Sequence, residues 1–406
     1  MSEELFESAE QESTGVSRRN FIKTAAVVGA SVLAVQAVGR TEAHAAEDAK
    51  NEAKAASAAA AGGGAKKLSD VLKTAREKLY PRCRVCPECD GVACSGEVPG
   101  MGGIGSGKAF RNNLQALAKY ELNMRTFHDV KDPDTSLTLF GVKLTMPIMS
   151  GVTGGTTYNM GLKGKVTEEE YAEGIIAGCA KAGTMGFAAD GIEDPLSVYE
   201  TRLKIVARYK GQALAQVKPR TQAEIIKRVR LLEAAGVPAF AIDIDSAGRA
   251  ARALPGQTVE PKTLKQLREI AKSTKLPFLI KGVMTPEEAL MALEAGAAGI
   301  VVSNHGGRVL DHTPGTSQVL PAIADKVKGR MIILADGGVR YGADVLKLLA
   351  LGANAVLVGR PLLRGSVGGG AVGVALMLNK LRDELVVSMT LTGTADVKKV
   401  SRNILA

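Results

Sequence analysis

Short apolar runs alternate with longer amphipathic stretches along the chain from about residue 132 onward. The runs have the length of buried strands, and the stretches between them repeat with helical periodicity. The runs expected to be strands are residues 147–152, 185–189, 213–217, 239–244, 277–281, 298–303, 331–335 and 354–358. Strands that alternate with helices in this way form parallel βα units. Eight such units predict a (β/α)8 barrel of the TIM type, although an open doubly wound sheet would give the same periodicity.

Glycines mark the ends of the helices predicted in this region. Helices are expected over residues 168–182, 222–235, 286–295 and 342–351. A glycine follows each of them, at Gly183, Gly236, Gly296 and Gly352. Glycine is favoured there because it adopts the left-handed conformation that ends a helix at little cost.

The segments before the barrel have a different character. Arg18 and Arg19 precede an apolar run over residues 24–38, and Ala43 and Ala45 supply small residues at the spacing of a cleavage site. This order indicates a twin-arginine export signal over residues 1–45, with an uncleaved amphipathic anchor as the alternative. Residues 46–67 are expected to form a low-complexity linker, 68–131 a Cys/Gly-rich N-terminal extension, and 132–406 the barrel. The predicted location is therefore extracytoplasmic, such as the periplasm.

Composition limits the functions that remain. The chain has 406 residues, is 46% hydrophobic and contains 46 glycines, which suits a large α/β core with many tight turns. Its net charge is +10, but the basic residues are dispersed and do not alternate with aromatic ones. That distribution argues against nucleic-acid binding and suits a small anionic substrate or a cofactor phosphate.

The catalytic residues of a barrel lie on the loops that follow the strands. His305 follows the sixth predicted strand in the hexapeptide Ser303-Asn304-His305-Gly306-Gly307-Arg308, and it is one of four histidines in the chain. Histidine is the side chain best suited to act as a base near neutral pH. We expect His305 to be that base, Asp245 to orient it, and Arg308 to bind a carboxylate through its planar guanidinium.

Two glycine-containing loops after the seventh and eighth strands predict a phosphate site. The first runs from Asp336 through Gly337 and Gly338 to Arg340, and the second is Gly359-Arg360. Bare backbone N–H groups and helix N-termini bind phosphate, and the two arginines would add charged hydrogen bonds.

Together these motifs resemble the FMN-dependent 2-hydroxy-acid dehydrogenase/oxidase family, which includes glycolate oxidase and lactate oxidase. The segments that carry the resemblance are the hexapeptide, Ile280-Lys281-Gly282-Val283, Asp336-Gly337-Gly338-Val339-Arg340, Gly359-Arg360-Pro361, Leu381-Arg382-Asp383-Glu384 and Val400-Ser401-Arg402. The resemblance implies that His305 takes a proton from the substrate while two electrons pass to FMN. It also implies that Arg308 holds the substrate carboxylate and that Lys281 lies beside the flavin. The other implied FMN contacts are Thr153, Gly154, Gln216, Ser303, Asp336, Gly338, Arg340, Gly359 and Arg360.

The chain differs from the family pattern at positions that are expected to lie near the substrate. Members usually place two tyrosines there, one of them in a Gln-x-Tyr, whereas the third strand here reads Gln216-Val217-Lys218. Lys218 would make the pocket more cationic and would contact substrate. Asp243 adds a carboxylate near the expected flavin, and the connection over residues 246–276 is shorter than the family's long loop.

Four of the five cysteines lie within twelve residues, at Cys83, Cys86, Cys89 and Cys94. This spacing permits an iron–sulfur cluster or a zinc ion, and an exported protein would equally permit disulfides. A cluster would carry electrons away from the flavin. The glycine-rich residues 100–107 are expected to lie over the barrel mouth.

The function indicated by the sequence is FMN-dependent oxidation of a small L-2-hydroxy acid such as lactate. The electron acceptor stays open, and assembly as a homo-oligomer is expected. Two alternatives remain: a non-redox FMN enzyme of the type 2 isopentenyl diphosphate isomerase kind, and a flavin-binding protein that has lost activity because of the missing tyrosines.

Overall fold

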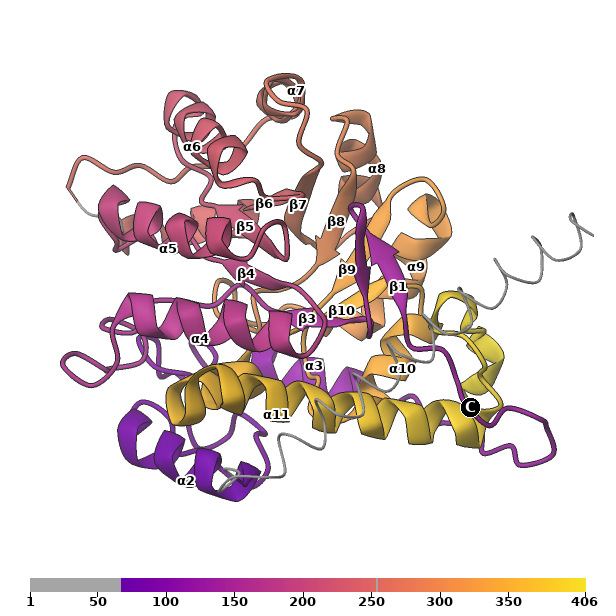
Figure 1. Ribbon diagram of the computed structural model, residues 1–406. Helices are drawn as coiled ribbons and strands as arrows, with labels where there is room; N and C mark the ends of the chain where they lie inside the picture. The colour runs from indigo at the N-terminus through magenta and orange to yellow at the C-terminus, as the bar shows by residue number, and fades with distance from the viewer. Residues whose placement is uncertain (1–66, 253–254) are drawn as a thin grey trace, which may run out of the picture. The chain divides into compact units, whose positions relative to one another are not determined.

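Eight parallel strands form the sheet at the centre of the molecule (Figure 1). We analysed a computed structural model, which describes residues 67–252 and 255–406. The strands are β3 (Ile148–Ser150), β4 (Gly186–Ala188), β5 (Ala213–Val217), β6 (Phe240–Asp243), β7 (Phe278–Val283), β8 (Gly299–Val302), β9 (Ile332–Ala335) and β10 (Ala355–Val358). All eight predicted strands are confirmed.

The sheet closes on itself. Its strand order is β3-β10-β9-β8-β7-β6-β5-β4, so β3 and β4 are the two ends. They meet where the N–H of Ser150 donates to the carbonyl oxygen of Met185 at 3.2 Å. The predicted (β/α)8 barrel is confirmed, and the open doubly wound sheet is not what the chain forms. The described residues belong to one compact unit, Lys66–Ala406. The expected twin-arginine signal and nearly all of the expected linker lie outside the described residues.

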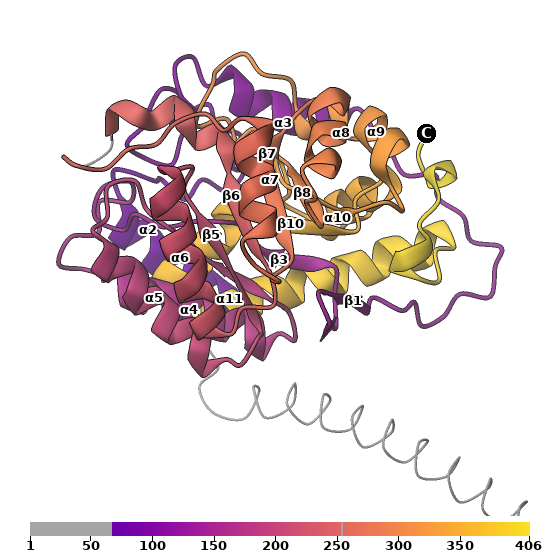
Figure 2. The same ribbon diagram turned by 90° about the horizontal axis from the view of Figure 1, so that it is seen from above.

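Helices surround the barrel (Figure 2). One α-helix follows each strand from β3 to β10: α4 (Glu168–Lys181), α5 (Leu196–Arg208), α6 (Gln222–Ala235), α7 (Leu264–Lys272), α8 (Pro286–Glu294), α9 (Thr316–Val327), α10 (Gly342–Ala350) and α11 (Arg360–Thr392). Thr167 and Thr263 form capping boxes, and Gly236 ends α6 in the left-handed conformation. These local signals explain why the predicted helices agree with the observed ones to within two residues.

Helix α11 follows the last strand, β10, and continues well past the barrel. In the described part of the chain it is the one helix that could cross a membrane by length and composition, yet 72% of its most apolar window is buried within the fold. It bends at Gly370, whose φ of 58° breaks the helical conformation. The apolar character of α11 is therefore accounted for by packing against α4 and α2.

The N-terminal extension is built onto the barrel rather than projecting from it. Its helix α2 (Leu68–Leu79) packs along α11, where a side chain at Gly368 would collide with the carbonyl oxygen of Val71 (Figure 1). Its second helix, α3 (Lys108–Ala118), packs on α9. The extension thus contributes directly to the surroundings of the barrel mouth.

A β-hairpin lies at the end of the barrel where the strands begin, opposite the barrel mouth. It pairs β1 (Leu137–Leu139) with β2 (Val142–Leu144) and leads straight into β3. Its buried leucines join the apolar cluster inside the barrel, which includes Met149 and Met185. The hairpin therefore covers the end where the strands begin, and the sequence pattern alone did not predict it.

Removing the buried leucine of this hairpin should destabilise the protein. Leu144 is 1% exposed, so Leu144→Ala leaves a cavity in the barrel interior, and we expect the free energy of unfolding to fall by about 2–5 kcal/mol. Denaturant unfolding followed by circular dichroism measures this change. Thr138→Ala on the exposed face of β1 is the matched control and should change the value by less than about 0.5 kcal/mol. Equal effects of the two substitutions would show that the hairpin does not seal the core.

Candidate functional site

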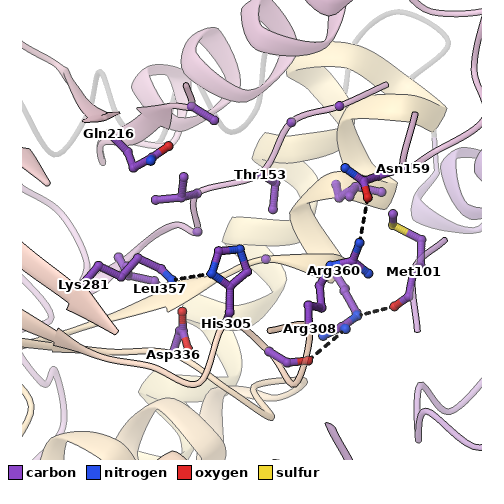
Figure 3. A pocket seen from close by; sticks show the side chains of 18 of the residues that line it. Met101, Thr153, Asn159, Gln216, Lys281, His305, Arg308, Asp336, Leu357 and Arg360 are labelled. Carbon is purple, nitrogen blue, oxygen red and sulfur yellow. Dashed lines mark hydrogen bonds between the residues drawn. The ribbon is translucent and has the colours of Figure 1, made fainter. Parts of the chain in front are cut away.

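A deep cavity opens at the carboxyl ends of the strands, where a barrel places its active site (Figure 3). Its empty volume, including the open mouth, is about 1110 Å³. The predicted site residues that line it are Thr153, Gly154, Gln216, Lys218, Lys281, His305, Arg308, Asp336, Gly338, Arg340, Gly359 and Arg360. The structure therefore brings most of the predicted site together on one rim.

His305 is held in a specific orientation. Its Nδ1 lies 3.1 Å from both carboxylate oxygens of Asp245 and 3.4 Å from Nζ of Lys281 (Figure 3). Its backbone φ is 57°, and its N–H donates to Oγ of Ser303 at 3.0 Å. Because the carboxylate accepts a hydrogen bond from Nδ1–H, the other ring nitrogen, Nε2, is left without a proton and is available to the cavity.

Two lysines balance the two buried carboxylates at the end of β6. Nζ of Lys218 donates to Asp243 at 2.6 Å and to Ser246 at 2.9 Å. Nζ of Lys281 lies 3.7 Å from Asp245. The extra carboxylate of Asp243 is therefore neutralised by Lys218 rather than directed at the cavity. Contact of Lys218 with substrate stays a prediction, although the residue does line the cavity.

The environment keeps His305 neutral. Burial and the neighbouring Lys281 ammonium lower the pKa of His305 to about 4, and they outweigh the opposite effect of Asp245. Burial alone would raise the pKa of Asp245, but Lys281 and His305 hold it well below its usual range. At neutral pH the pair is thus an anionic carboxylate and an unprotonated imidazole, which is the state that a general base requires.

Three donor atoms of this cluster, from Asp243, Asp245 and His305, lie within 4.8 Å of one another. Such a group resembles a metal site. However, each carboxylate already has a lysine ammonium beside it, and a second cation there would be repelled. We therefore assign the cluster to proton chemistry.

Arg308 faces the same cavity and is fixed by the glycine-rich loop. Its Nη1 donates to the carbonyl oxygens of Gly100 and Gly102 at 2.6 and 3.0 Å, and its Nη2 donates to Oδ1 of Asn159 at 3.0 Å (Figure 3). The N–H of Ile104 donates to Gly307, directly beside Arg308. The expected placement of residues 100–107 against the barrel mouth is therefore observed.

One of the four arginines that line the cavity, Arg249, was not predicted from the sequence. Arg249 follows β6, is 9% exposed, and pairs with Glu193 at 3.5 Å. Asn159, the acceptor for Arg308, was missed as well. A signal for Arg249 exists, because it lies in the segment after β6 that also carries Asp245. No tyrosine lines the cavity among the described residues, in agreement with the departure noted from sequence.

The two predicted phosphate loops form one cradle. Gly337 and Gly338 have φ values of 100° and 87°, and a side chain at either would collide with Asn113 of α3. Gly359 caps the N-terminus of α11, so bare amides face the cavity there. The conformation and the close packing both require glycine, as a phosphate-binding turn does.

The cradle arginines are anchored to the N-terminal extension. Arg340 donates to the carbonyl oxygen of Cys89 at 3.0 Å. Arg360 donates to that of Met101 at 2.8 Å and stacks on the ring of Phe110, 3.9 Å from its centroid. Burial lowers the pKa of Arg360 to about 10, which leaves it protonated at neutral pH. Both cations thus stay close to the glycine amides.

The cavity has the features that FMN requires. Asp336 lines it, and its buried Oδ1 has no hydrogen-bond partner, whereas its Oδ2 accepts from Ser303 at 2.8 Å. A buried acceptor without a donor points to a missing ligand hydroxyl, such as those of the ribityl chain. Ser303 itself does not line the cavity and acts through Asp336. Gln216 lines it, but its amide is engaged by Asp243 and by the N–H of Asp190.

Comparison with known proteins decides the family. A family model described as FMN-dependent dehydrogenase matches residues 100–262 and 249–406. The chain belongs to the FMN-dependent dehydrogenase family. It is 32% identical to glycolate oxidase 3 of Arabidopsis thaliana over 72% of this chain and 86% of that protein, and 32% identical to L-lactate dehydrogenase of Caulobacter vibrioides over 75% and 91%. The crystal structure of mandelate oxidase superposes with a TM-score of 0.67 at 29% identity, covering 84% of this chain and 97% of that one.

Membership in the FMN-dependent dehydrogenase family confirms the resemblance noted from the sequence. It also confirms that the protein is an FMN-dependent oxidoreductase, as expected from the sequence. The non-redox isomerase alternative is not favoured. The residues fitted to hold FMN are Lys281, Asp336, Gly338, Arg340, Gly359 and Arg360.

The titration of His305 is directly measurable. In NMR spectra of the holoprotein we expect its ring signals to titrate with a midpoint near pH 4, so that the ring is neutral at pH 7. Asp245→Asn should move the midpoint lower still, because the carboxylate stabilises the protonated ring. Asp325→Asn on the exposed face of α9 is the control and should leave the midpoint unchanged. A midpoint near the ordinary value of about 6.5 would contradict the buried, lysine-flanked environment.

Loss of a cradle cation should weaken FMN binding. Arg340→Ala removes a guanidinium beside the glycine amides, and a charged hydrogen bond of about 1.5–3 kcal/mol corresponds to roughly a 10–100-fold increase in the dissociation constant for FMN. Fluorescence titration of the apoprotein with FMN measures this. Arg330→Ala, on the exposed surface, should bind FMN normally. Unchanged affinity in Arg340→Ala would remove this arginine from the phosphate site.

Proposed function

We propose that the protein oxidises a small L-2-hydroxy acid, such as lactate, to the 2-oxo acid. The observation that carries this proposal is the pairing of an oriented neutral base, His305, with Arg308 in one cavity. A base and a carboxylate-binding arginine match the two functional groups of a 2-hydroxy acid. The names of the relatives, which include glycolate oxidase and L-lactate dehydrogenase, support the same substrate class.

The protein groups have separate roles in this reaction. Arg308 binds the substrate carboxylate and, with Arg249, makes this side of the cavity cationic. His305 accepts a proton from the substrate at Nε2, and Asp245 stabilises the imidazolium that results. When bound, FMN supplies the two-electron acceptor.

Lys281 has an electrostatic role. Its ammonium is 3% exposed and lies among Asp245, His305 and the cavity wall. Before proton transfer it opposes protonation of His305, which keeps the base free. It also places a fixed positive charge where negative charge on a reduced cofactor would need one.

The surroundings of the pocket favour a small substrate. Lys218, at the position where the family pattern noted from the sequence has a tyrosine, is held by Asp243 and Ser246. Arg249 and Arg308 supply positive charge on this side of the cavity. The glycine-rich loop holds Arg308 in place through the carbonyl oxygens of Gly100 and Gly102. A compact, anionic 2-hydroxy acid fits this combination better than one with a bulky apolar group.

The export, assembly and metal content of the protein are the subject of three further proposals. We propose export by the twin-arginine route, supported by the paired Arg18 and Arg19, and assembly as a homo-oligomer. We also propose that the four clustered cysteines ligate a metal centre rather than form disulfides. All four are free thiols in the structure.

Anaerobic mixing with candidate substrates tests the proposed function. L-Lactate, glycolate or mandelate should bleach the absorbance of the bound flavin, with lactate or glycolate the faster. His305→Ala should slow bleaching by about 10²–10⁴-fold while the flavin stays bound, because it removes the base but not the cofactor contacts.

His312→Ala is the matched control, since His312 is an exposed histidine outside the cavity, and it should bleach at the normal rate. A holoprotein that none of the 2-hydroxy acids bleaches would contradict the proposed function. That result would favour a flavin-binding protein without this activity.

A further inference from the structure

The four clustered cysteines surround a small cavity of their own. Cys83, Cys86, Cys89 and Cys94 all line it, together with Arg364 and Met101. Cys83 and Cys89 are buried, and the other two are partly buried. Four thiols from a twelve-residue segment thus line one small cavity.

The sulfur atoms are too far apart for a single metal ion. In the described part of the chain, no three cysteine sulfurs lie within 4.8 Å of one another. A zinc ion bound at about 2.3 Å by four thiolates would bring them to within about 4 Å. A four-iron cluster places each thiolate on a different iron, so the sulfurs stand further apart around a larger volume. The arrangement therefore fits a cluster better than a single zinc ion.

A buried arginine points into this cavity. Arg364, in the first turns of α11, is 9% exposed, and its Nη2 lies 3.0 Å from Sγ of Cys89 and 3.7 Å from Sγ of Cys83. Its Nε has no hydrogen-bond partner. A buried guanidinium requires compensating negative charge. A cluster with four thiolate ligands is anionic and would supply it, whereas neutral thiols or disulfides would not.

The backbone around Cys83 is also shaped for a sulfur ligand. Val85 has a φ of 44°, an unfavourable value for a β-branched residue, and its N–H lies 3.4 Å from Sγ of Cys83. Backbone N–H groups directed at ligand sulfurs are a means by which proteins adjust iron–sulfur clusters. The strained turn provides one such donor.

The cysteine cavity adjoins the flavin cavity. Met101 lines both of them. Arg340, of the phosphate cradle, donates to the carbonyl oxygen of Cys89, and the loop at Gly102 packs directly on the carbonyl oxygen of Cys94. The two cavities therefore share a wall at Met101.

We propose that Cys83, Cys86, Cys89 and Cys94 bind a [4Fe–4S] cluster that takes electrons from the reduced flavin. The proposal rests on the proposed function. Oxidation of the 2-hydroxy acid releases two electrons and two protons, and the protons leave to solvent. The cluster accepts one electron at a time, so two successive transfers return the flavin to its oxidised state. An external one-electron carrier protein takes up each electron in turn.

Metal analysis of the full-length protein, purified without oxygen, tests the site independently of any substrate. We expect about four iron and four acid-labile sulfide per chain, and an electron paramagnetic resonance signal from the cluster after reduction with dithionite. Cys89→Ser should lose most of the iron. Cys179→Ser is the matched control, because Cys179 is buried in α4 away from the cavity, and it should retain the iron. One zinc per chain, or disulfides found by mass spectrometry with no metal, would overturn the proposal.

Arg364→Gln provides a variant that keeps all four ligands. Loss of a positive charge beside the cluster disfavours its reduction, so the midpoint potential should fall while the iron content is retained. Arg330→Gln on the surface should leave the potential unchanged. An unaltered potential in Arg364→Gln would show that Arg364 does not face a cluster.

The transfer step is tested by adding L-lactate to the oxygen-free holoprotein in place of dithionite. We expect the flavin to bleach and the resonance signal of the reduced cluster to appear. His305→Ala should show neither change on the same time scale. Bleached flavin with a cluster that stays oxidised would overturn the electron transfer alone. A protein that contains iron and sulfide but whose flavin does not bleach would instead contradict the proposed function.

Discussion

The mouth of the barrel depends on the pairing of two buried carboxylates with two lysines. Asp243 and Asp245 are both at the end of β6, and either one unpaired would be strongly destabilising. Lys218 neutralises the first and Lys281 lies beside the second, so His305 does not need to be protonated to balance the charge. The catalytic state of His305 is therefore a consequence of how the carboxylates are paired.

The N-terminal extension completes a site that the barrel alone would leave open. Carbonyl oxygens of its glycine-rich loop hold Arg308 and Arg360, and Asn113 of α3 packs on the phosphate cradle. The same extension carries the four cysteines. Substrate binding, flavin binding and the proposed route for electrons thus share one segment, and changes in that segment should affect all three.

The sequence predicted the fold well because its signals are local. Strand lengths, threonine caps and terminal glycines are all readable residue by residue, and His305, Asp245 and Lys281 follow strands whose ends must meet in a barrel. The hairpin β1–β2 and Arg249 were missed because their significance lies in distant contacts. The partners of Arg308 were unpredictable for the same reason, since Gly100 is about two hundred residues away along the chain.

A crystal structure of the holoprotein with a bound 2-oxo acid product would show whether His305 is the base. The product carboxylate should contact Arg308 on the side of the cavity that Arg249 also lines, and the keto oxygen should lie about 2.6–3.2 Å from Nε2 of His305. His305 should keep its Nδ1 on Asp245. A product bound with its carboxylate away from Arg308, or with Nε2 turned out of reach, would contradict the assignment of His305 as the base.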